Sequence, residues 1–471
     1  EKRKEAAFAV GKETQMLKFL RRAGRVAVFA LIAAALLAAS VACSPAEGGE
    51  QPASSLELSR DRVDLLLSGE YTLEAVSLTV GGEPREIGTL RWNSEDGSVA
   101  AVSAAGVVTA VGTGETSVTA EDVATGVRSE PVVVRVYEGE EEISLDSDRI
   151  NYYGRVMPRT AESVMFYNTA SAFEVRFIGS SLKASLRASA EALRVQVYVD
   201  GEAQEEQQRI STFRMDYTFA DGLAEGMAHT VRVVKVNSAN KGNLELNGIA
   251  TDGAFVEAPE KPGLKFEFYG DSITAGYGVN AYPGEENSIR NEDGTATFAY
   301  LASEALGAQA SIMCYSGMSA VVPVPSNGYE PDSERTFSNL YGQYAPGVLS
   351  AEWDFSSYQA DVVFVCLGTN DYYGIQQGAG TNESFVNGFV QFVSDLRAKT
   401  PEASIVLCYG MMHKNLDAQF KEIVGKCGDS DVYYLPMDIV ESGGYNSHPG
   451  RSGQKAGAEQ LVRFLHDKGI C

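Results

Sequence analysis

The sequence predicts a multidomain protein in which two all-β sandwiches precede an α/β domain built on a parallel sheet. Residues 56–260 are rich in short, Val-rich runs that alternate apolar and polar side chains, the pattern of half-buried strands. From Leu264 onward, apolar strand-like runs alternate with helical patterns, which indicates a parallel sheet covered on both faces. At 471 residues, the chain is long enough for roughly three such domains.

The first 42 residues differ from the rest of the chain. Three arginines among residues 21–25 precede the apolar run Val26–Ala42, which is shorter and weaker than the ~20 residues that a membrane span needs. A basic stretch, a short apolar core and then small residues are typical of a secretory signal. We therefore expect residues 1–42 to be a signal segment, with Met16 as a candidate natural start.

Ser40-Val41-Ala42-Cys43 resembles the cleavage box of bacterial lipoproteins, in which the cysteine receives the lipid. Cys43 is thus a candidate lipidation site that would tether the protein to a membrane, although Ser40 replaces the usual leucine of that box. Ordinary signal cleavage with full secretion, or an uncleaved anchor, is the alternative. Residues 43–55 are rich in Pro, Gly, Glu and Ser and would form a flexible linker.

The formal net charge of −24 restricts the possible partners. An acidic surface repels phosphate backbones, so nucleic acid is not expected as a partner, and a neutral polysaccharide suits the charge better. No group of Cys and His residues has zinc-site spacing, so we expect no metal and no cofactor. Buried free thiols are expected at Cys314, Cys366 and Cys408, whereas Cys427 and Cys471 could pair.

The first predicted sandwich covers residues 56–137. The stretch from Trp92 to Ala120 closely resembles the group 2 bacterial immunoglobulin-like domain, with Gly106 and Gly114 at its turns. This resemblance implies a sandwich with Trp92 as its buried aromatic residue. It also implies a spacer or adhesion module, and since the segment offers no candidate site, we expect a spacer.

An acidic linker is expected at residues 138–142, followed by a second sandwich over 143–262. Asp200-Gly201 between two alternating runs predicts a β-hairpin. The polar faces of the strands, with residues such as Glu174 and Arg176, could bind sugar, but a solvated scaffold face is the simpler interpretation. Runs with period-two alternation occur at 173–178, 193–199 and 229–236.

Residues 263–471 form the predicted α/β domain. Its strand-like runs are 264–269, 310–315, 362–367, 404–408 and 432–435, and its helical candidates are 297–306, 383–398, 416–425 and 453–468. In such sheets the active site lies at the carboxyl ends of the strands. Ser272, Gly317 and Asn370 each follow a strand within three residues, so we expect them at one edge of the sheet.

Ser272 lies two residues after Gly270, where a strand ends in a sharp turn that can expose a serine hydroxyl. A serine becomes a nucleophile only when a base accepts its proton. His448, in a Gly-, Asn- and Ser-rich loop before the last helix, is the favoured base, and His413 is its rival.

Donors for an anionic intermediate are also available. The backbone N–H groups of Ser272 and Gly317 and the side-chain amide of Asn370 could form an oxyanion hole. Taken singly, a turn glycine at Gly317 and a strand-ending Asx turn at Asn370 would be simpler interpretations. Their common position, each after a strand, favours the catalytic one.

Together, Gly270-Asp271-Ser272, Gly317, Gly368-Thr369-Asn370-Asp371 and His448-Pro449 resemble the four blocks of the SGNH/GDSL hydrolases. That resemblance implies a flavodoxin-like parallel sheet. With the upstream segments 151–155, 177–182, 199–201 and 229–233, the chain is similar to carbohydrate esterase family 2. The family implies a jelly-roll-like sandwich joined to the hydrolase, and removal of acetyl groups from plant polysaccharides such as xylan and mannan. Candidate sugar-stacking residues are Tyr277, Trp353 and Tyr372.

One departure from the SGNH pattern concerns the acid that usually precedes the histidine by two or three residues. Those positions are Asn446 and Tyr445 here. We therefore predict a Ser272–His448 dyad in which a backbone carbonyl of residues 444–447, or the amide oxygen of Asn446, orients the imidazole. Asp438 and Glu441 are the nearest upstream acids, and the loop would have to fold back to bring either one to His448.

The leading hypothesis is an extracellular, membrane-tethered acetyl esterase. The alternative is a non-catalytic glycan-binding or adhesion lipoprotein with a degenerate hydrolase domain; the intact Ser272, Asn370 and His448 argue against it and the missing acid argues for it. A lipase-like esterase is a third hypothesis, but no lid-like apolar stretch precedes the site.

Overall fold

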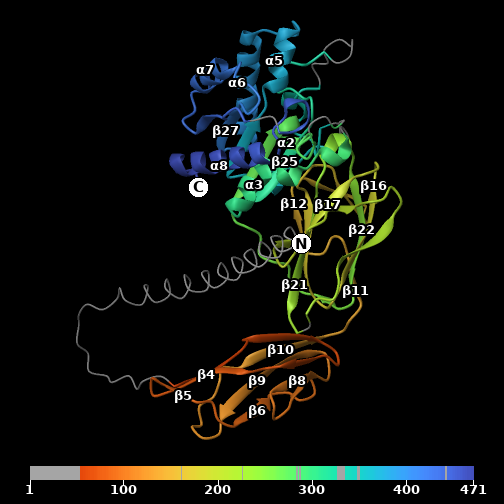
Figure 1. The fold of residues 1–471 in the computed structure, drawn as a ribbon, viewed down its shortest axis with the longest axis vertical. Helices are drawn as coiled ribbons and strands as arrows, with labels where there is room; N and C mark the ends of the chain where they lie inside the picture. Colours follow the sequence, from red (N-terminus) through yellow and green to blue (C-terminus); the bar gives the residue numbers. More distant parts are fainter. Residues whose placement is uncertain are drawn as a thin grey trace, which may run out of the picture. The chain divides into compact units, whose positions relative to one another are not determined.

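The computed structural model describes residues 54–471, except 161, 225, 283–284, 286–287, 326–334, 347–350 and 441–442 (Figure 1). The expected signal segment, Met16, Cys43 and most of the linker therefore lie outside the described residues, and so does Glu441. In the part of the chain that is described, no helix combines the length and apolarity that crossing a membrane requires.

The first sandwich is made of short antiparallel strands with one parallel pair, between β2 and β10. One sheet has the order β2-β10-β9-β6, a second has β3-β8-β7, and β1 pairs with β4. The strands are β1 (Ser55–Leu58), β2 (Arg62–Leu66), β3 (Glu70–Thr72), β4 (Ala75–Val80), β5 (Glu83–Arg85), β6 (Leu90–Ser94), β7 (Ala100–Val102), β8 (Val107–Ala110), β9 (Gly114–Asp122) and β10 (Val132–Tyr137).

Trp92 is not the fully buried residue that the sequence resemblance implied. It packs against the core of Val63, Val118 and Val134 but is only partly buried. Gly106 explains its position, because a Cβ there would lie 2.8 Å from Cζ2 of Trp92. The indole ring therefore covers the edge of this core, beside a turn that has room only for glycine.

The second sandwich consists of two facing antiparallel sheets. One has the order β13-β14-β22-β16-β20, with β11 also paired to β22, and the other has β12-β15-β21-β17-β18, with β19 on β17 and β23 on β15. The elements are β11 (Glu141–Ile143), β12 (Ile150–Tyr153), β13 (Val156–Thr160), β14 (Ser163–Phe166), β15 (Ala172–Ile178), β16 (Leu182–Ala188), β17 (Arg194–Val199), β18 (Glu202–Ala203), β19 (Gln208–Arg209), β20 (Met215–Ala220), β21 (Ala228–Lys235), η1 (Ala239–Lys241), β22 (Leu244–Thr251) and β23 (Ala254–Phe255).

The period-two pattern of this sandwich is the cause of its two-sheet packing. On β15, Phe173, Val175 and Phe177 are buried in the core, and the residues between them face outward. The predicted hairpin is confirmed, since Asp200 and Gly201 both have positive φ and connect β17 to β18.

The expected acidic linker at 138–142 is wrong at its C-terminal end. Glu141 begins β11, which pairs with β22 of the second sandwich. The carboxylate of Glu141 accepts hydrogen bonds from Arg149 Nη2, at 2.7 Å, and from the backbone N–H of Phe255, at 2.8 Å. Acidic composition suggested a solvated linker, but these two partners give the carboxylate a place in the sandwich.

The third domain has a five-stranded, all-parallel sheet of order β25-β24-β26-β27-β28, which confirms the predicted flavodoxin-like fold. Its strands are β24 (Lys265–Gly270), β25 (Gln309–Cys314), β26 (Val362–Cys366), β27 (Ser404–Tyr409) and β28 (Val432–Pro436). Its α-helices are α2 (Ser272–Ala275), α3 (Phe298–Ala305), α4 (Phe337–Leu340), α5 (Thr369–Gln376), α6 (Asn382–Lys399), α7 (Asp417–Cys427) and α8 (Arg451–Lys468). The 3-10 helices are η2 (Ile289–Asn291), η3 (Gly294–Ala296), η4 (Phe355–Ser357) and η5 (Tyr445–Ser447).

Apolar residues on both sides of this sheet account for its buried strands. Phe298 of α3 and Leu461 of α8 belong to one core cluster, and Phe389 of α6 and Phe420 of α7 belong to the other. The helices α3 and α8 thus cover one face and α6 and α7 the opposite face (Figure 1). The cysteines among the described residues are all free thiols: Cys314, Cys366 and Cys408 are buried, and Cys427 and Cys471 are not paired.

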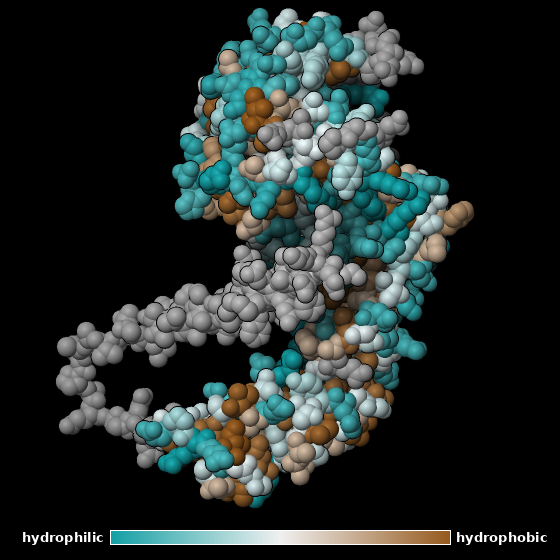
Figure 2. Space-filling view, in the orientation of Figure 1, coloured by the Kyte–Doolittle hydropathy of each residue, from teal (hydrophilic) through white to brown (hydrophobic). Residues whose placement is uncertain are grey.

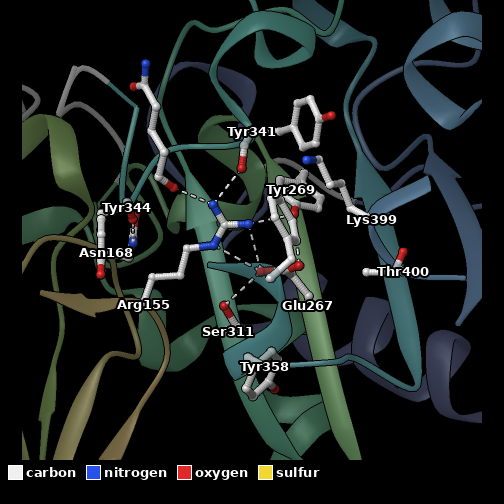
Figure 3. A network of polar contacts seen from close by, with 12 residues as sticks. Arg155, Asn168, Glu267, Tyr269, Ser311, Tyr341, Tyr344, Tyr358, Lys399 and Thr400 are labelled. Carbon is white, nitrogen blue, oxygen red and sulfur yellow. Dashed lines mark hydrogen bonds and ion pairs between the residues drawn. The ribbon is translucent and has the colours of Figure 1, made fainter. Parts of the chain in front are cut away.

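A buried arginine joins the second sandwich to the hydrolase sheet (Figure 3). Arg155, in the turn between β12 and β13, has no exposed side-chain surface. Its guanidinium donates to Glu267 Oε1 at 3.1 and 2.9 Å and to the hydroxyl of Tyr269 at 2.7 Å, both on β24. It also donates to the backbone carbonyls of Tyr341 and Gln343. All five N–H donors of the arginine are therefore used within this junction.

Candidate active site

Ser272 stands at the carboxyl end of β24, as the first residue of the short helix α2. Gly270 permits the tight turn, because a Cβ there would lie 2.1 Å from Oγ1 of Thr274. Asp271 caps the helix by accepting a hydrogen bond from the backbone N–H of Ile273 at 2.9 Å. This turn fixes the serine at the edge of the sheet where the sequence placed it.

His448 reaches Ser272 from the loop before α8. The Oγ of Ser272 and the Nε2 of His448 are 2.7 Å apart, a hydrogen-bond distance. Left-handed backbone at Asn446 and Ser447, with φ of 51° and 62°, turns the chain sharply ahead of the histidine. The backbone N–H of Tyr445 donates to the carbonyl of Gly278 at 3.1 Å and ties this loop to the segment after α2.

Two backbone carbonyls orient the imidazole. The Nδ1 of His448 lies 3.1 Å from the carbonyl oxygen of Tyr445 and 3.0 Å from that of Asn446. Because a carbonyl only accepts, Nδ1 carries the proton and Nε2 presents its lone pair to the serine. Asn446 thus contacts the ring through its backbone rather than through its amide oxygen. Among the described residues no carboxylate contacts Nδ1, and Asp438 is instead 3.6 Å from Lys414 Nζ.

Burial governs the charge of this histidine. Removal from water lowers the pKa of His448 below its ordinary value of 6.5, while the two carbonyls oppose the shift. The imidazole is therefore neutral at neutral pH and able to accept a proton. The rival, His413, lies beside Tyr409, whose hydroxyl is 2.8 Å from its Nδ1. Among the described residues, Ser272 is paired with His448 and not with His413.

The candidate oxyanion donors converge on the same place. As the first residue of a helix, Ser272 has a backbone N–H without an intrahelical partner. Gly317, with φ of 85°, has open space where a Cβ would stand. The amide of Asn370 donates one hydrogen bond to the carbonyl of Met318 at 3.0 Å, which fixes the side chain and leaves its second N–H.

Asp371 holds the loop that carries Gly317, a role that the sequence did not reveal. Its carboxylate accepts hydrogen bonds at 2.8 Å from each of three successive backbone N–H groups, those of Ala320, Val321 and Val322. Burial raises the pKa of Asp371, and burial near this second carboxylate raises the pKa of Asp271 to about 7. Asn370-Asp371 lies in the first turn of α5, not in the isolated Asx turn that was the alternative.

These groups line one cavity of about 580 Å³. Tyr277 lines it, and its ring centroid lies 4.8 Å from that of His448. Trp353 and Tyr372, the other two candidate sugar contacts, do not line this cavity. Trp353 instead packs over the guanidinium of Arg155 at 5.3 Å, and Tyr372 packs against His413. Residues to which the sequence assigned no side-chain role also line it: Asn240, Lys241, Ser316, Thr369, Tyr373, Met412 and Ser447.

No group of three or more metal-ligating side chains occurs among the described residues. The cavity presents a buried serine, a neutral imidazole and an array of N–H donors. Such an arrangement can carry out acyl transfer through a covalent serine intermediate.

Comparison with known families agrees with this geometry. Family models match residues 73–133 as a bacterial Ig-like domain of group 2, residues 152–259 as the carbohydrate esterase 2 N-terminal domain, and residues 268–426 as the GDSL-like lipase/acylhydrolase family. The chain thus carries these three domains in series, which confirms the resemblances seen in the sequence.

The chain is also similar to individual proteins and solved structures. The chain is 27% identical over 318 residues to "Cellulase/esterase CelE" of Acetivibrio thermocellus, covering 64% of this chain and 37% of that protein. It is 25% identical over 245 residues to "Acetylxylan esterase / glucomannan deacetylase" of Cellvibrio japonicus, covering 50% and 66% of the two chains. A family two carbohydrate esterase from Clostridium thermocellum, solved in complex with cellohexaose, has a TM-score of 0.62 at 26% identity and covers 68% of this chain and all of its own.

Proposed function

We propose that this protein is a carboxylic ester hydrolase that removes O-acetyl groups from plant polysaccharides. The observation that carries the proposal is the 2.7 Å contact between Ser272 Oγ and His448 Nε2 at the wall of the cavity. In the first step, the Ser272 proton passes to Nε2 while Oγ forms a bond to the acetyl carbon. The N–H groups of Ser272, Gly317 and Asn370 stabilise the resulting oxyanion.

His448 then returns the proton that it accepted, and later acts as a base again. The imidazolium returns its proton to the sugar oxygen as the bond to the acetyl carbon breaks, which leaves an acetyl-enzyme and a free hydroxyl. Water then attacks this ester with His448 as base, releasing acetate and restoring the serine. Carbonyl oxygens in place of a carboxylate hold the imidazole in the required tautomer. They stabilise the imidazolium less than a negative charge would.

Acetylated xylan and glucomannan are the substrates that we propose. The names of the Cellvibrio japonicus relative and the cellohexaose complex support a β-linked glycan. Tyr277 and Tyr373 offer aromatic faces in the cavity on which a sugar ring can stack. A lipid substrate fits less well. On the face shown in Figure 2, hydrophilic residues cover much of the hydrolase domain, and its exposed large hydrophobic residues among those described are Tyr282, Tyr373 and Ile439.

We further propose that the protein acts outside the cell, tethered through a lipid on Cys43. The sequence motif that ends at Cys43 and the relatives named for cell-wall polysaccharides support this location. Metabolic labelling with a fatty-acid analogue tests it, with Cys43→Ser as the control. Absence of label from the unchanged chain would contradict the anchor.

Release of acetate from acetylated xylan and glucomannan by the purified protein tests the activity. Ser272→Ala should lower the rate on an activated acetyl ester by roughly a thousandfold or more, as expected for loss of a nucleophile. The exposed Ser356 of η4 supplies a matched control, and Ser356→Ala should retain the full rate. A covalent serine inhibitor should label Ser272 alone; label on another serine, or acetyl release by Ser272→Ala, would show a different site. Glycan binding without acetate release would favour the non-catalytic alternative.

A further inference from the structure

The cavity carries a cation that the proposed reaction does not use. Among the described lining residues, Lys241 is the one with a permanently charged side chain, and none is a carboxylate. The chain as a whole has a formal net charge of −24, so its general field repels anionic ligands. A positive group in the cavity of such an acidic protein is therefore an exception that calls for a specific account.

Lys241 comes from the second sandwich and not from the hydrolase domain. It is the last residue of η1, between β21 and β22, and its side chain is 20% exposed. The ammonium lies 5.4 Å from the ring centroid of Tyr277, and that ring lies 4.8 Å from the imidazole of His448. Since the two distances share the Tyr277 ring, the ammonium is within about 10 Å of the imidazole.

A buried carboxylate positions this lysine without saturating it. Glu292 is 1% exposed, and its Oε1 accepts from both the backbone N–H and the hydroxyl of Ser238 at 2.8 Å. Its Oε2 has no hydrogen bond within the described structure and lies 3.9 Å from Lys241 Nζ. That separation is beyond a direct N–H···O bond, so the lysine keeps its N–H donors for another acceptor.

Other basic groups share the charge of Glu292. The fully buried Lys235 interacts with the same carboxylate, although burial lowers the pKa of this lysine to about 7. Arg194 donates to the backbone carbonyl of Glu292 at 2.6 Å and interacts electrostatically with the carboxylates of Asp293 and Glu292. Glu292 therefore interacts with several basic side chains and is not the exclusive partner of Lys241.

We propose that Lys241 binds a carboxylate on the glycan, so that the enzyme prefers acetylated chains bearing a uronic acid close to the acetylated sugar. This inference rests on the proposed esterase function and adds a substrate class to it. It also revises the expectation of a neutral polysaccharide, which followed from the overall charge. A guest carboxylate would complete the hydrogen bonding of the ammonium in a partly desolvated site, where an ionic contact is stronger than at an open surface.

The test compares two substrates in one assay. Acetylated xylotriose and acetylated xylotriose with one glucuronosyl branch differ by the acidic sugar. For the unchanged protein, kcat/KM for acetate release should be at least about fivefold higher on the acidic substrate, with the difference in KM. Lys241→Met should lower this ratio by at least about fivefold, to about one, and Lys241→Arg should keep it. Lys183→Met removes an exposed lysine from the same sandwich and should leave the ratio unchanged.

The ratio does not depend on how much of a variant is folded. If Lys241→Met yields no active protein, the unchanged enzyme still gives an answer, because raising NaCl from 0.05 to 0.5 M should lower its ratio towards one. A ratio of one or less at low salt, or an equal loss on both substrates in Lys241→Met, would overturn the proposal and leave a structural lysine. Failure of the unchanged enzyme on both substrates and on an activated acetyl ester would instead show that the esterase function itself is wrong.

Discussion

The two β-sandwiches of this chain are similar in architecture and differ in what their polar residues do. In the first, the buried Asp64 and Asp122 pair with neighbours of their own domain, such as Arg62 and Thr125. In the second, Arg155 reaches into the hydrolase sheet, and Lys241 reaches the cavity. Among the described lining residues, none comes from the first sandwich. The two sandwiches thus differ in where their basic side chains go. The second sandwich belongs to the catalytic unit because its basic side chains contact the hydrolase domain or line the cavity, and not because of its sandwich fold.

The largest effect is expected at His448, which neither sandwich supplies. His448→Ala should lower kcat/KM by roughly a thousandfold or more, because no other described base contacts the serine. Asn446→Ala keeps the backbone carbonyl and should cost less than about tenfold, or about 1.4 kcal/mol. Asp438→Ala and Glu441→Ala should be equally mild, and steady-state kinetics on an activated acetyl ester measures all four. A collapse in either acid variant, with the fold intact, would reveal a third catalytic member.

The next effect concerns the junction. Arg155→Met should lower the free energy of unfolding by about 3–5 kcal/mol, because it leaves Glu267 charged and buried without its partner. Arg135→Met in the first sandwich removes an exposed pair with Glu115 and should cost about 1 kcal/mol or less. Urea unfolding of both variants, monitored by circular dichroism, measures the two losses in the free energy of unfolding. Equal losses would show that the two sandwiches are not distinguished by their buried charges.

A smaller effect should appear in the pH profile. His448 must be neutral to act as a base, and burial lowers its pKa, so kcat/KM should fall only as the pH drops through a value below 6.5. Opening the cavity to water should move this limb upward, towards 6.5. The pH dependence of kcat/KM for the unchanged enzyme measures the position of the acid limb. An acid limb above 6.5 in the unchanged enzyme would contradict the role of burial.

Removal of the first sandwich should have the smallest effect. A truncated chain that starts at Glu138 keeps β11 intact and should retain kcat on a soluble substrate within about twofold. A start after Ile143 would remove β11 and the contacts of Glu141 with Arg149 and Phe255, and should lower stability. Comparing thermal unfolding of the two truncated chains locates the boundary. A large loss of kcat in the longer one would show that the first sandwich contributes to catalysis.

Much of the fold was predictable because it depends on local patterns. Period-two alternation places Phe173, Val175 and Phe177 in a core, and the buried run of β26 indicates a parallel strand. The candidate site residues could also be predicted from local sequence, since each follows a strand or lies in a Gly-, Asn- and Ser-rich loop. They are Ser272, Gly317, Asn370 and His448. The absence of an acid at two positions also indicated a neutral acceptor at Nδ1, but it left open whether a backbone carbonyl or the amide oxygen of Asn446 supplies it.

The rest depends on contacts between residues far apart in the sequence. Nothing near Arg155 indicates that Glu267, 112 positions later, will be its partner. The polar sequence around Lys241 does not indicate that this residue lines the cavity. The sequence around Asp371 indicates only an acid after a strand, and not that its carboxylate binds the backbone of Ala320. Glu141 was assigned to a linker because composition cannot show that Arg149 will pair with it. A single sequence gives the strands but not the partners that decide where a charged residue is buried.

The Arg155 junction also has a consequence for how such chains diversify. Every N–H of this guanidinium meets an acceptor on the hydrolase side, so exchanging either domain for an unrelated one would bury an unmatched charge. A gene rearrangement that cuts between residues 262 and 264 should therefore be purged, whereas one that cuts near Glu138 should be tolerated. The second sandwich and the hydrolase should be inherited together as a single module, and the immunoglobulin-like domain should be gained and lost freely.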